Sequence, residues 1–278
     1  MGWRFSLAGV GLKFSMLRSG NRFTCPASGA GGDWIMKLPD AVFRHVPLNE
    51  YTMMRFAGAV GIEVPEVVLV HRDEIDELPP SAWPGTEQWA FAVRRFDRPE
   101  GGQRVHIEDL AQVRGVYPVS KYEGNYETVA GLVYRGHDEV ALREFVRRLT
   151  FFVLIGNGDA HLKNWSLIYR DRRVPTLSPA YDIVSTETYR PDGSAEDLGL
   201  KFAGSRRFES VRVHHFDRFE HKLGTRLDLA DIAAQTVRST VEAWPRFANE
   251  LVAAPSIRDA IGGAVVERAT SLMGGRPR

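Results

Sequence analysis

Apolar and polar residues alternate in short runs over roughly the first hundred residues of the chain. Two such runs flank Ser19, Gly20 and Asn21, and this pattern predicts a β-hairpin. Further short runs with the composition of strands follow it: "DWIMKLPD" (33–40), "VPEVVLVHR" (64–72) and "EQWAFAVRRFDR" (87–98). The sequence therefore predicts a small β-sheet near the N-terminus.

Helical spacing replaces this alternation elsewhere. Residues 48–62 repeat apolar positions every three to four residues, with Gly61 as the expected C-cap. After a Pro- and Gly-containing connector the chain becomes mainly helical in pattern, with helices expected over 138–157, 229–244 and 256–273 and a hairpin over 164–185. We predict an α+β fold of two lobes: a β-rich lobe over 1–98 and a larger helical lobe over 99–278.

Composition narrows the class of protein. Hydrophobic residues make up 44% of the 278 residues and charged residues 26%, as in globular proteins. A net charge of +1 gives the protein no overall electrostatic attraction to nucleic acid or to acidic membranes. One cysteine, Cys25, excludes an internal disulfide framework and fits a reducing compartment. Without an apolar run of membrane-spanning length or a signal-peptide pattern, we expect a cytoplasmic protein with no membrane partner.

The candidate chemistry begins in "GNGDAHLKN" (156–164), a polar loop between two apolar segments. Such loops often hold functional groups, although Asn and Gly also build ordinary turns, and the loop alone leaves both readings open. Asp159 and Asn164 have the D-x-x-x-x-N spacing of protein-kinase catalytic loops. A carboxylate there can accept a hydroxyl proton, and an amide oxygen suits magnesium. The spacing alone is weak evidence.

Two charged residues strengthen the interpretation. Asp182 follows the expected hairpin and could supply a second metal ligand, or it could be a turn residue. Lys37 lies in an apolar strand, where it could point to solvent or contact nucleotide phosphates. Glu50, early in the next helix, is the expected ion-pair partner of Lys37.

The segment "SLAGVGLK" (6–13) could bring backbone amides close to phosphates through Gly9 and Gly11, although two glycines in a hairpin are more often a turn or bulge. The order of the features carries more weight than any one of them. A glycine-rich hairpin, a strand lysine, a helix glutamate, a connector, a D-x-x-x-x-N loop and a distal aspartate follow one another, and chance is a poor account of all six.

Together these motifs resemble the HipA family of bacterial toxin serine/threonine kinases. The resemblance runs from Ser6 to about Ala203 through "SLAGVGLKFS", "WIMKLP", "NEYTMMRFAGAVGIEVP", "VRRFDR", "GNGDAHLKNWSL" and "LSPAYDIVS". It implies a protein-kinase-like fold that uses ATP and Mg²⁺.

The resemblance also implies roles for individual residues. Asp159 would be the catalytic base, Asn164 and Asp182 the metal ligands, and Lys37 a contact to the ATP phosphates. The remaining nucleotide contacts would be Ala8, Gly9, Val10, Gly11, Leu12 and Lys13 in a phosphate loop, Arg94, Arg95 and Phe96 at the adenine hinge, and His161, Lys163 and Tyr181 in the same cleft. Ser6 matches a serine that such kinases phosphorylate in themselves, and its phosphate would conflict electrostatically with bound ATP.

The resemblance further implies partners. Family members phosphorylate aminoacyl-tRNA synthetases and are inhibited by a helix-turn-helix antitoxin, so DNA would be contacted only indirectly. The chain begins near the phosphate loop, as in short toxins of three-component systems, in which a small accessory protein supplies an N-terminal subdomain. Arg94 replaces an acidic hinge residue of the best-known relative.

A toxin kinase is therefore the leading hypothesis, and two alternatives stay open. A small-molecule phosphotransferase would use the same Asp and Asn chemistry. An ATP-binding pseudokinase would act only within a repressor complex. A scaffold has no need of a base and two metal ligands, so this alternative is opposed by the presence of Asp159, Asn164, Asp182 and Lys37.

Overall fold

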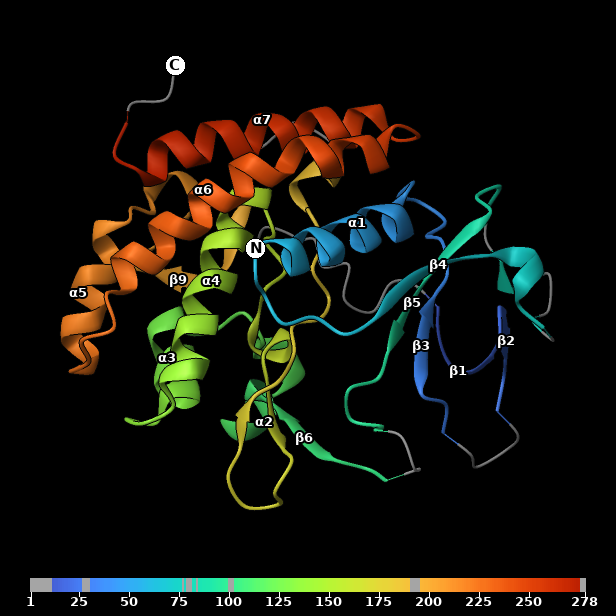
Figure 1. Cartoon of the computed structure of the whole chain (residues 1–278), viewed down its shortest axis with the longest axis horizontal. Helices are drawn as coiled ribbons and strands as arrows, with labels where there is room; N and C mark the ends of the chain where they lie inside the picture. Colours follow the sequence, from blue (N-terminus) through green and yellow to red (C-terminus); the bar gives the residue numbers. More distant parts are fainter. Residues whose placement is uncertain are drawn as a thin grey trace.

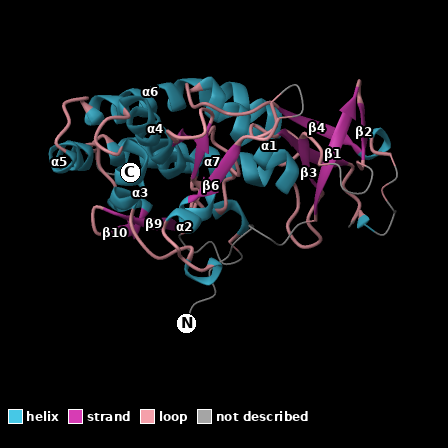
Figure 2. Cartoon of the chain, turned by 90° about the horizontal axis from the view of Figure 1, so that it is seen from below, coloured by secondary structure: helices cyan, strands magenta, loops and turns pink. Residues whose placement is uncertain are grey.

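A sheet and a group of helices occupy opposite ends of the molecule, and helix α1 (Val46–Ala59) lies between them (Figure 1). The computed structural model describes residues 12–26, 31–76, 78, 82–83, 85–99, 103–190 and 196–275. The view from below shows the same separation of the five-stranded sheet from the helices (Figure 2). The expected phosphate-loop residues Ala8, Gly9, Val10 and Gly11, and Ser6 before them, lie outside the described residues.

The large sheet is antiparallel throughout. In spatial order its strands are β2 (Arg22–Thr24), β1 (Lys13–Ser19), β3 (Trp34–Lys37), β5 (Trp89–Arg94) and β4 (Val67–His71). The expected hairpin and the three further strands are thus confirmed. Trp34 and Met36 face a small core on one side, whereas Ile35 and Lys37 point to the other side because successive side chains of a strand alternate. This second side faces the helices.

Helix α1 covers that face of the sheet. Its side chains Met53, Met54 and Phe56 are fully buried. The helix ends at Ala59 with Val60 as its C-cap, and Gly61 follows with a φ of 87°, a left-handed conformation that glycine adopts without strain. The predicted helix is confirmed, whereas the C-cap is Val60 and Gly61 lies one residue beyond it.

The remaining helices are α2 (Leu110–Val113), α3 (Tyr126–Tyr134), α4 (Glu139–Ile155), α5 (His214–Leu223), α6 (Leu229–Ala248) and α7 (Pro255–Leu272). Helix α4 is the central one, since nearly every side chain after Phe145 is buried. The side chain of Asp138 caps its start by accepting a hydrogen bond from the N–H of Ala141 at 3.0 Å. The expected α4, α6 and α7 are present, whereas α2, α3 and α5 were not predicted.

Two smaller sheets complete the fold. One has the order β6 (His106–Asp109), β7 (Ser166–Tyr169) and β8 (Thr176–Leu177), and the other pairs β9 (Asp197–Phe202) with β10 (Ser205–Arg207). The β7–β8 hairpin was predicted, and β6, β9 and β10 were not. Both sheets lie close to the loop that follows α4 and help to fix it.

One hydrophobic core runs from α1 through α4 to α6 and α7. Phe56 of α1 stacks on Phe247 of α6 with ring centroids 4.9 Å apart, so the helix beside the sheet packs directly against the helical part. The boundary between Arg98 and Pro99 stays a prediction. Over the described ranges, none of the helices has the length and apolar character needed to cross a membrane.

Candidate nucleotide-binding and phosphoryl-transfer site

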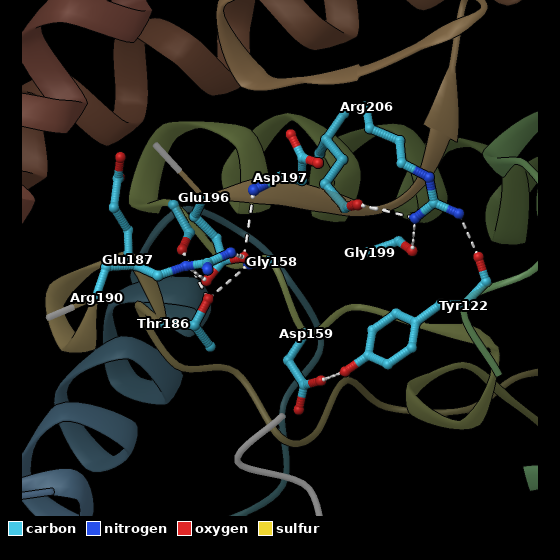
Figure 3. A network of polar contacts seen from close by, with 12 residues as sticks. Tyr122, Gly158, Asp159, Thr186, Glu187, Arg190, Glu196, Asp197, Gly199 and Arg206 are labelled. Atoms are coloured by element: carbon cyan, nitrogen blue, oxygen red, sulfur yellow. Dashed lines mark hydrogen bonds and ion pairs between the residues drawn. The ribbon is translucent and has the colours of Figure 1, made fainter. Parts of the chain in front are cut away.

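The loop that follows α4 is held in a narrow space. Gly156 ends the helix with a φ of 68°, and the Gly158 N–H donates to the Thr186 hydroxyl at 2.8 Å (Figure 3). A Cβ on Gly158 would lie 2.4 Å from Cγ of Glu196, which is closer than atoms can approach. Only glycine fits at position 158. Packing against the neighbouring chain therefore requires the second glycine of "GNG", so this stretch is more than an ordinary turn.

Asp159 is fixed from several directions. Its N–H donates to Oδ1 of Asn157 at 3.1 Å, and its carbonyl accepts from Nδ2 of Asn164 at 2.8 Å. Its carboxylate accepts a hydrogen bond from the hydroxyl of Tyr122 (Figure 3). The residue is 3% exposed, so this carboxylate is a buried and oriented acceptor. Asp159 and Asn164 are therefore brought together, as their spacing predicted.

Lys37 lies between two carboxylates from distant parts of the chain. Its ammonium contacts Oε1 of Glu50 on α1 and Oδ1 of Asp182. Burial alone would lower the pKa of Lys37, but the charges of Asp182 and Glu50 outweigh it and raise that pKa above its usual value. The predicted Lys37–Glu50 pair is present, and Asp182 joins it.

Asp182 has an unusual backbone and an unusually acidic side chain. Its φ of 53° is left-handed, a conformation that aspartate tolerates better than most residues. Burial would raise the pKa of its carboxyl group, but Lys37 and Lys13 lower it to about 2. The preceding segment is anchored by Arg148 of α4, which donates to the carbonyl of Ser178 at 2.8 Å. Asp182 is thus a positioned anion.

A cavity of about 270 Å³ opens beside these charges. Its wall contains the apolar side chains of Ile35, Met54, Phe91, Val93 and Ile107. Charged side chains also line it: Lys13, Lys37, Lys163, Arg94 and Arg95 are positive, and Asp97, Asp109 and Asp182 are negative. Lys13 lies directly opposite Lys37 in the β1–β3 ladder, and the ammonium of Lys37 lies 5.5 Å from the centre of the Phe91 ring. The cavity therefore offers both apolar contacts and cations to a ligand that carries a flat apolar group and an anionic group.

The expected hinge residues also line the cavity. Phe96 lies beside Tyr181, with ring centroids 5.8 Å apart, and both rings face the same space. Arg95 forms a bidentate ion pair with Asp97, in which the distance from Nη2 to Oδ2 is 2.8 Å. The N–H groups of Arg94 and Arg95 donate to the carbonyls of Glu66 and Asp33, so these two amides are engaged in the fold.

His161 is buried at the edge of the charged cluster. It is 1% exposed, and burial together with the positive charge of Lys121 lowers its pKa to about 3, so the ring is neutral at pH 7. Its Nε2 lies 3.6 Å from Oδ1 of Asp159. Lys121 is near both Asp159 and Asp182, because the charges of both act on its pKa, which burial lowers. Asp159, His161 and Asp182 thus belong to one electrostatic unit, although the cavity wall contains only Asp182 of the three.

The side chains of Asn164 and Asp182 carry oxygen atoms of the kind that magnesium prefers. The Nδ2 group of Asn164 is used to brace the loop, so its carbonyl oxygen is the atom of that side chain that could ligate a metal. Asp182 offers carboxylate oxygens kept ionised by nearby lysines. One amide oxygen and one carboxylate, completed by water and phosphate oxygens, are a typical Mg²⁺ set. No group of three or more His, Cys, Asp or Glu side chains with metal-binding geometry occurs in the described part of the chain.

Several contributors to the site were not predicted. Among them, Tyr122 contacts Asp159, Met54 of α1 forms part of the cavity wall, and Asp109 pairs with Lys163 at 3.4 Å. The helical period of α1 pointed to a buried face that includes Met54. Nothing in "VSKYEG" around Tyr122 suggested that its hydroxyl would be next to Asp159.

Comparison with known proteins shows the family to which the chain belongs. Residues 5–244 match the family described as the HipA-like C-terminal domain. The chain belongs to this family. Its fold is that of a two-lobed kinase, with a β-rich part and a helical part.

The HipA-like relatives include proteins named as kinases. Y4dM, a candidate kinase of Sinorhizobium fredii, is 43% identical over 93% of this chain and 63% of its own length. The serine/threonine-protein kinase toxin HipA of Shewanella oneidensis is 30% identical over 67% of this chain and 44% of its own length. The chain thus spans less than two thirds of the length of these relatives.

Two solved structures share the HipA-like fold. The Shewanella oneidensis HipA in a complex with HipB and operator DNA gives a TM-score of 0.80 at 22% identity, covering 98% of this chain and 66% of that one. The Helicobacter pylori proinflammatory kinase CtkA gives a TM-score of 0.55 at 13% identity, and the match covers 92% of this chain and 87% of the CtkA chain.

Proposed function

We propose that this HipA-like chain is an ATP- and Mg²⁺-dependent serine/threonine kinase that acts as the toxin of a bacterial toxin–antitoxin system. The observation that carries the proposal is a single cavity whose wall combines apolar side chains with lysines, next to the Lys37–Glu50–Asp182 cluster. An adenine ring suits the apolar wall, and a triphosphate suits the lysines.

The reaction follows from the positions of the charged groups. Lys37 and Lys13 would hold the phosphates of ATP, and Asp182 and Asn164 would hold Mg²⁺, which would neutralise charge on the transferring phosphoryl group. Asp159 would accept the proton of a serine or threonine hydroxyl. The hydroxyl oxygen then bonds to the γ-phosphorus while the bond from that phosphorus to the β–γ bridging oxygen breaks, and ADP leaves. His161, neutral at pH 7, adds no positive charge beside Asp159.

Substrate and partners are extensions of this proposal. We propose a protein substrate, with an aminoacyl-tRNA synthetase as the expected one, and autophosphorylation at Ser6. A relative, the Shewanella HipA, has been solved with HipB and operator DNA. By analogy we propose a helix-turn-helix antitoxin as the partner that restrains this chain, and a small accessory protein as a further partner to be tested.

A labelled-phosphate assay tests the kinase proposal. The purified chain is incubated with γ-labelled ATP and Mg²⁺, alone and with a bacterial lysate, beside an Asp159→Ala variant. We expect label on the chain itself and on a lysate protein, and none with the variant. Transfer only to a small molecule would identify a phosphotransferase of a different class. ATP binding without any transfer would identify a pseudokinase.

A further inference from the structure

The hydroxyl of Tyr122 is directed at the carboxylate of Asp159. The two residues are 37 positions apart in sequence, and the hydroxyl donates to Oδ1 (Figure 3). The Tyr122 ring meets the ring of His161 edge to face, with centroids 5.0 Å apart, and the ammonium of Lys121 lies 5.1 Å from the centre of the same ring. Tyr122 is therefore part of the buried charged cluster.

The backbone of Asp159 is fixed independently of this contact. Asn157 accepts from its N–H and Asn164 donates to its carbonyl. These bonds hold the main chain, but they do not fix the side-chain torsion angles of Asp159, which set the direction of its carboxylate. A hydrogen bond to one carboxylate oxygen fixes that rotation, and with it the direction in which the second oxygen points. Tyr122 supplies such a bond.

Tyr122 is in turn held by Arg206 of β10. One guanidinium nitrogen, Nη2, donates to the carbonyl of Tyr122, and the other, Nη1, donates to the carbonyl of Gly199 at 2.7 Å (Figure 3). One side chain thus joins the Tyr122 segment to β9. Strand β9 itself touches the loop, since a Cβ on Gly199 would lie 2.7 Å from the carbonyl carbon of Ala160. The β9–β10 hairpin therefore braces both Tyr122 and the loop that carries Asp159.

We propose that Tyr122 is a positioning residue that orients the carboxylate of Asp159, and that Arg206 holds Tyr122 in place for this task. The inference rests on the proposed kinase function, because it assigns to Asp159 the role of base. Tyr122 lies outside the nucleotide cavity. Its loss should therefore slow phosphoryl transfer and leave ATP binding intact, whereas a general loosening of the fold would weaken both.

The kinetic test compares wild type with Tyr122→Phe and Arg206→Gln. A hydrogen bond to a charged group is worth enough that we expect kcat to fall about ten- to a hundredfold in Tyr122→Phe. The KM for ATP should stay within about twofold of the wild-type value. The midpoint temperature of thermal unfolding should stay within a few degrees of the wild-type midpoint. Arg206→Gln should act in the same direction. Arg207→Gln is the matched control, because the neighbouring Arg207 side chain is 76% exposed, and its kcat should be unchanged.

A spectroscopic test examines the contact without relying on activity. In protein labelled with ¹³C at the tyrosine ζ carbon, the signal missing from Tyr122→Phe identifies Tyr122. A hydrogen bond donated to a carboxylate polarises the phenol O–H bond, so the ¹³Cζ chemical shift of Tyr122 at neutral pH should change in Asp159→Asn. An unchanged chemical shift would refute the contact. An unchanged kcat in Tyr122→Phe, with Asp159→Ala inactive, would refute the positioning role, whereas a wild type that transfers no phosphate would overturn the proposed function and this role with it.

Discussion

The ammonium of Lys37 on β3 contacts the carboxylate of Asp182, which lies 145 residues further along the chain. Glu50 of α1 completes the cluster from a third element. The sheet, the covering helix and the segment after β8 are thus joined at one point by opposite charges. Lys37 and Asp182 both line the cavity, so the contact that unites the fold also places groups proposed to hold phosphate and metal.

Replacing Lys37 by Met should affect both ATP binding and stability. The lysine side chain is 16% exposed and that of Glu50 6%, so the change would leave two carboxylates close together without their cation. Breaking a fully buried pair costs about 3–5 kcal/mol, and we expect about 1–3 kcal/mol here because Asp182 is partly exposed. Urea unfolding measures this cost, and calorimetry should show ATP binding at least tenfold weaker. Lys222→Met, at an exposed position on α5, is the control and should change neither quantity.

Replacing Asp182 by Asn should separate metal-dependent from metal-independent binding. The variant loses one proposed Mg²⁺ ligand and also one negative charge near the phosphates. We therefore expect ATP with Mg²⁺ to bind more weakly and transfer to fall about a hundredfold or more, whereas ATP with EDTA should bind as well as before or better. Titrations of ATP with and without Mg²⁺ measure the difference. Equal weakening under both conditions would show that Asp182 does not act through a metal.

His161 should make the protein less stable in mild acid. Its pKa is about 3 in the folded protein, because the ring is buried, against about 6.5 when unfolded. Between these values the unfolded chain binds a proton that the folded chain does not, so stability is complete above about pH 6.5 and is lost as the pH falls toward 3. The unfolding free energy should decrease by up to about 1 kcal/mol per pH unit in this range. His161→Gln should flatten that slope between pH 6.5 and 4, and an identical slope would contradict the assignment.

Replacing Gly199 by Ala should disturb the loop that carries Asp159 without removing any of its chemical groups. The added Cβ would lie 2.7 Å from the carbonyl carbon of Ala160, so β9 must move away. We expect a loss of about 1–3 kcal/mol in stability, as for other overpacked positions, and a lower kcat. Gly131→Ala is the matched control: it lies in α3 with no atom near its added Cβ, and alanine should stabilise that helix by up to about 1 kcal/mol.

Local patterns in the sequence predicted much of the fold. The alternation of Trp34 and Met36 with Ile35 and Lys37 indicated β3, and its orientation puts Lys37 on the side of α1. The helical spacing of apolar residues in α4 indicated the helix that ends at the loop carrying Asp159. Strand β9 was missed although Leu198, Leu200 and Phe202 alternate as strand residues do, because Gly199 weakens the pattern.

Contacts that depend on distant residues could not be predicted in the same way. The position of Tyr122 depends on Arg206, 84 residues later, and its own segment reads as an exposed turn. The kinase-like order of the motifs predicted the ion pair between Lys37 and Glu50, which the structure contains. It did not indicate that Asp182 would contact Lys37 directly, because that contact depends on how the sheet and the helical part pack together.

The most direct test of the account is the rate of phosphoryl transfer from ATP in single turnover, with Asp159→Asn compared with wild type. The change keeps the size of the side chain and should leave the ATP dissociation constant within about twofold, because Asp159 lies outside the cavity wall. We predict a transfer rate lower by at least about a thousandfold, since base and orientation are both lost. Equal rates in the two proteins, at equal ATP affinity, would contradict the assignment of Asp159 as the base of a kinase.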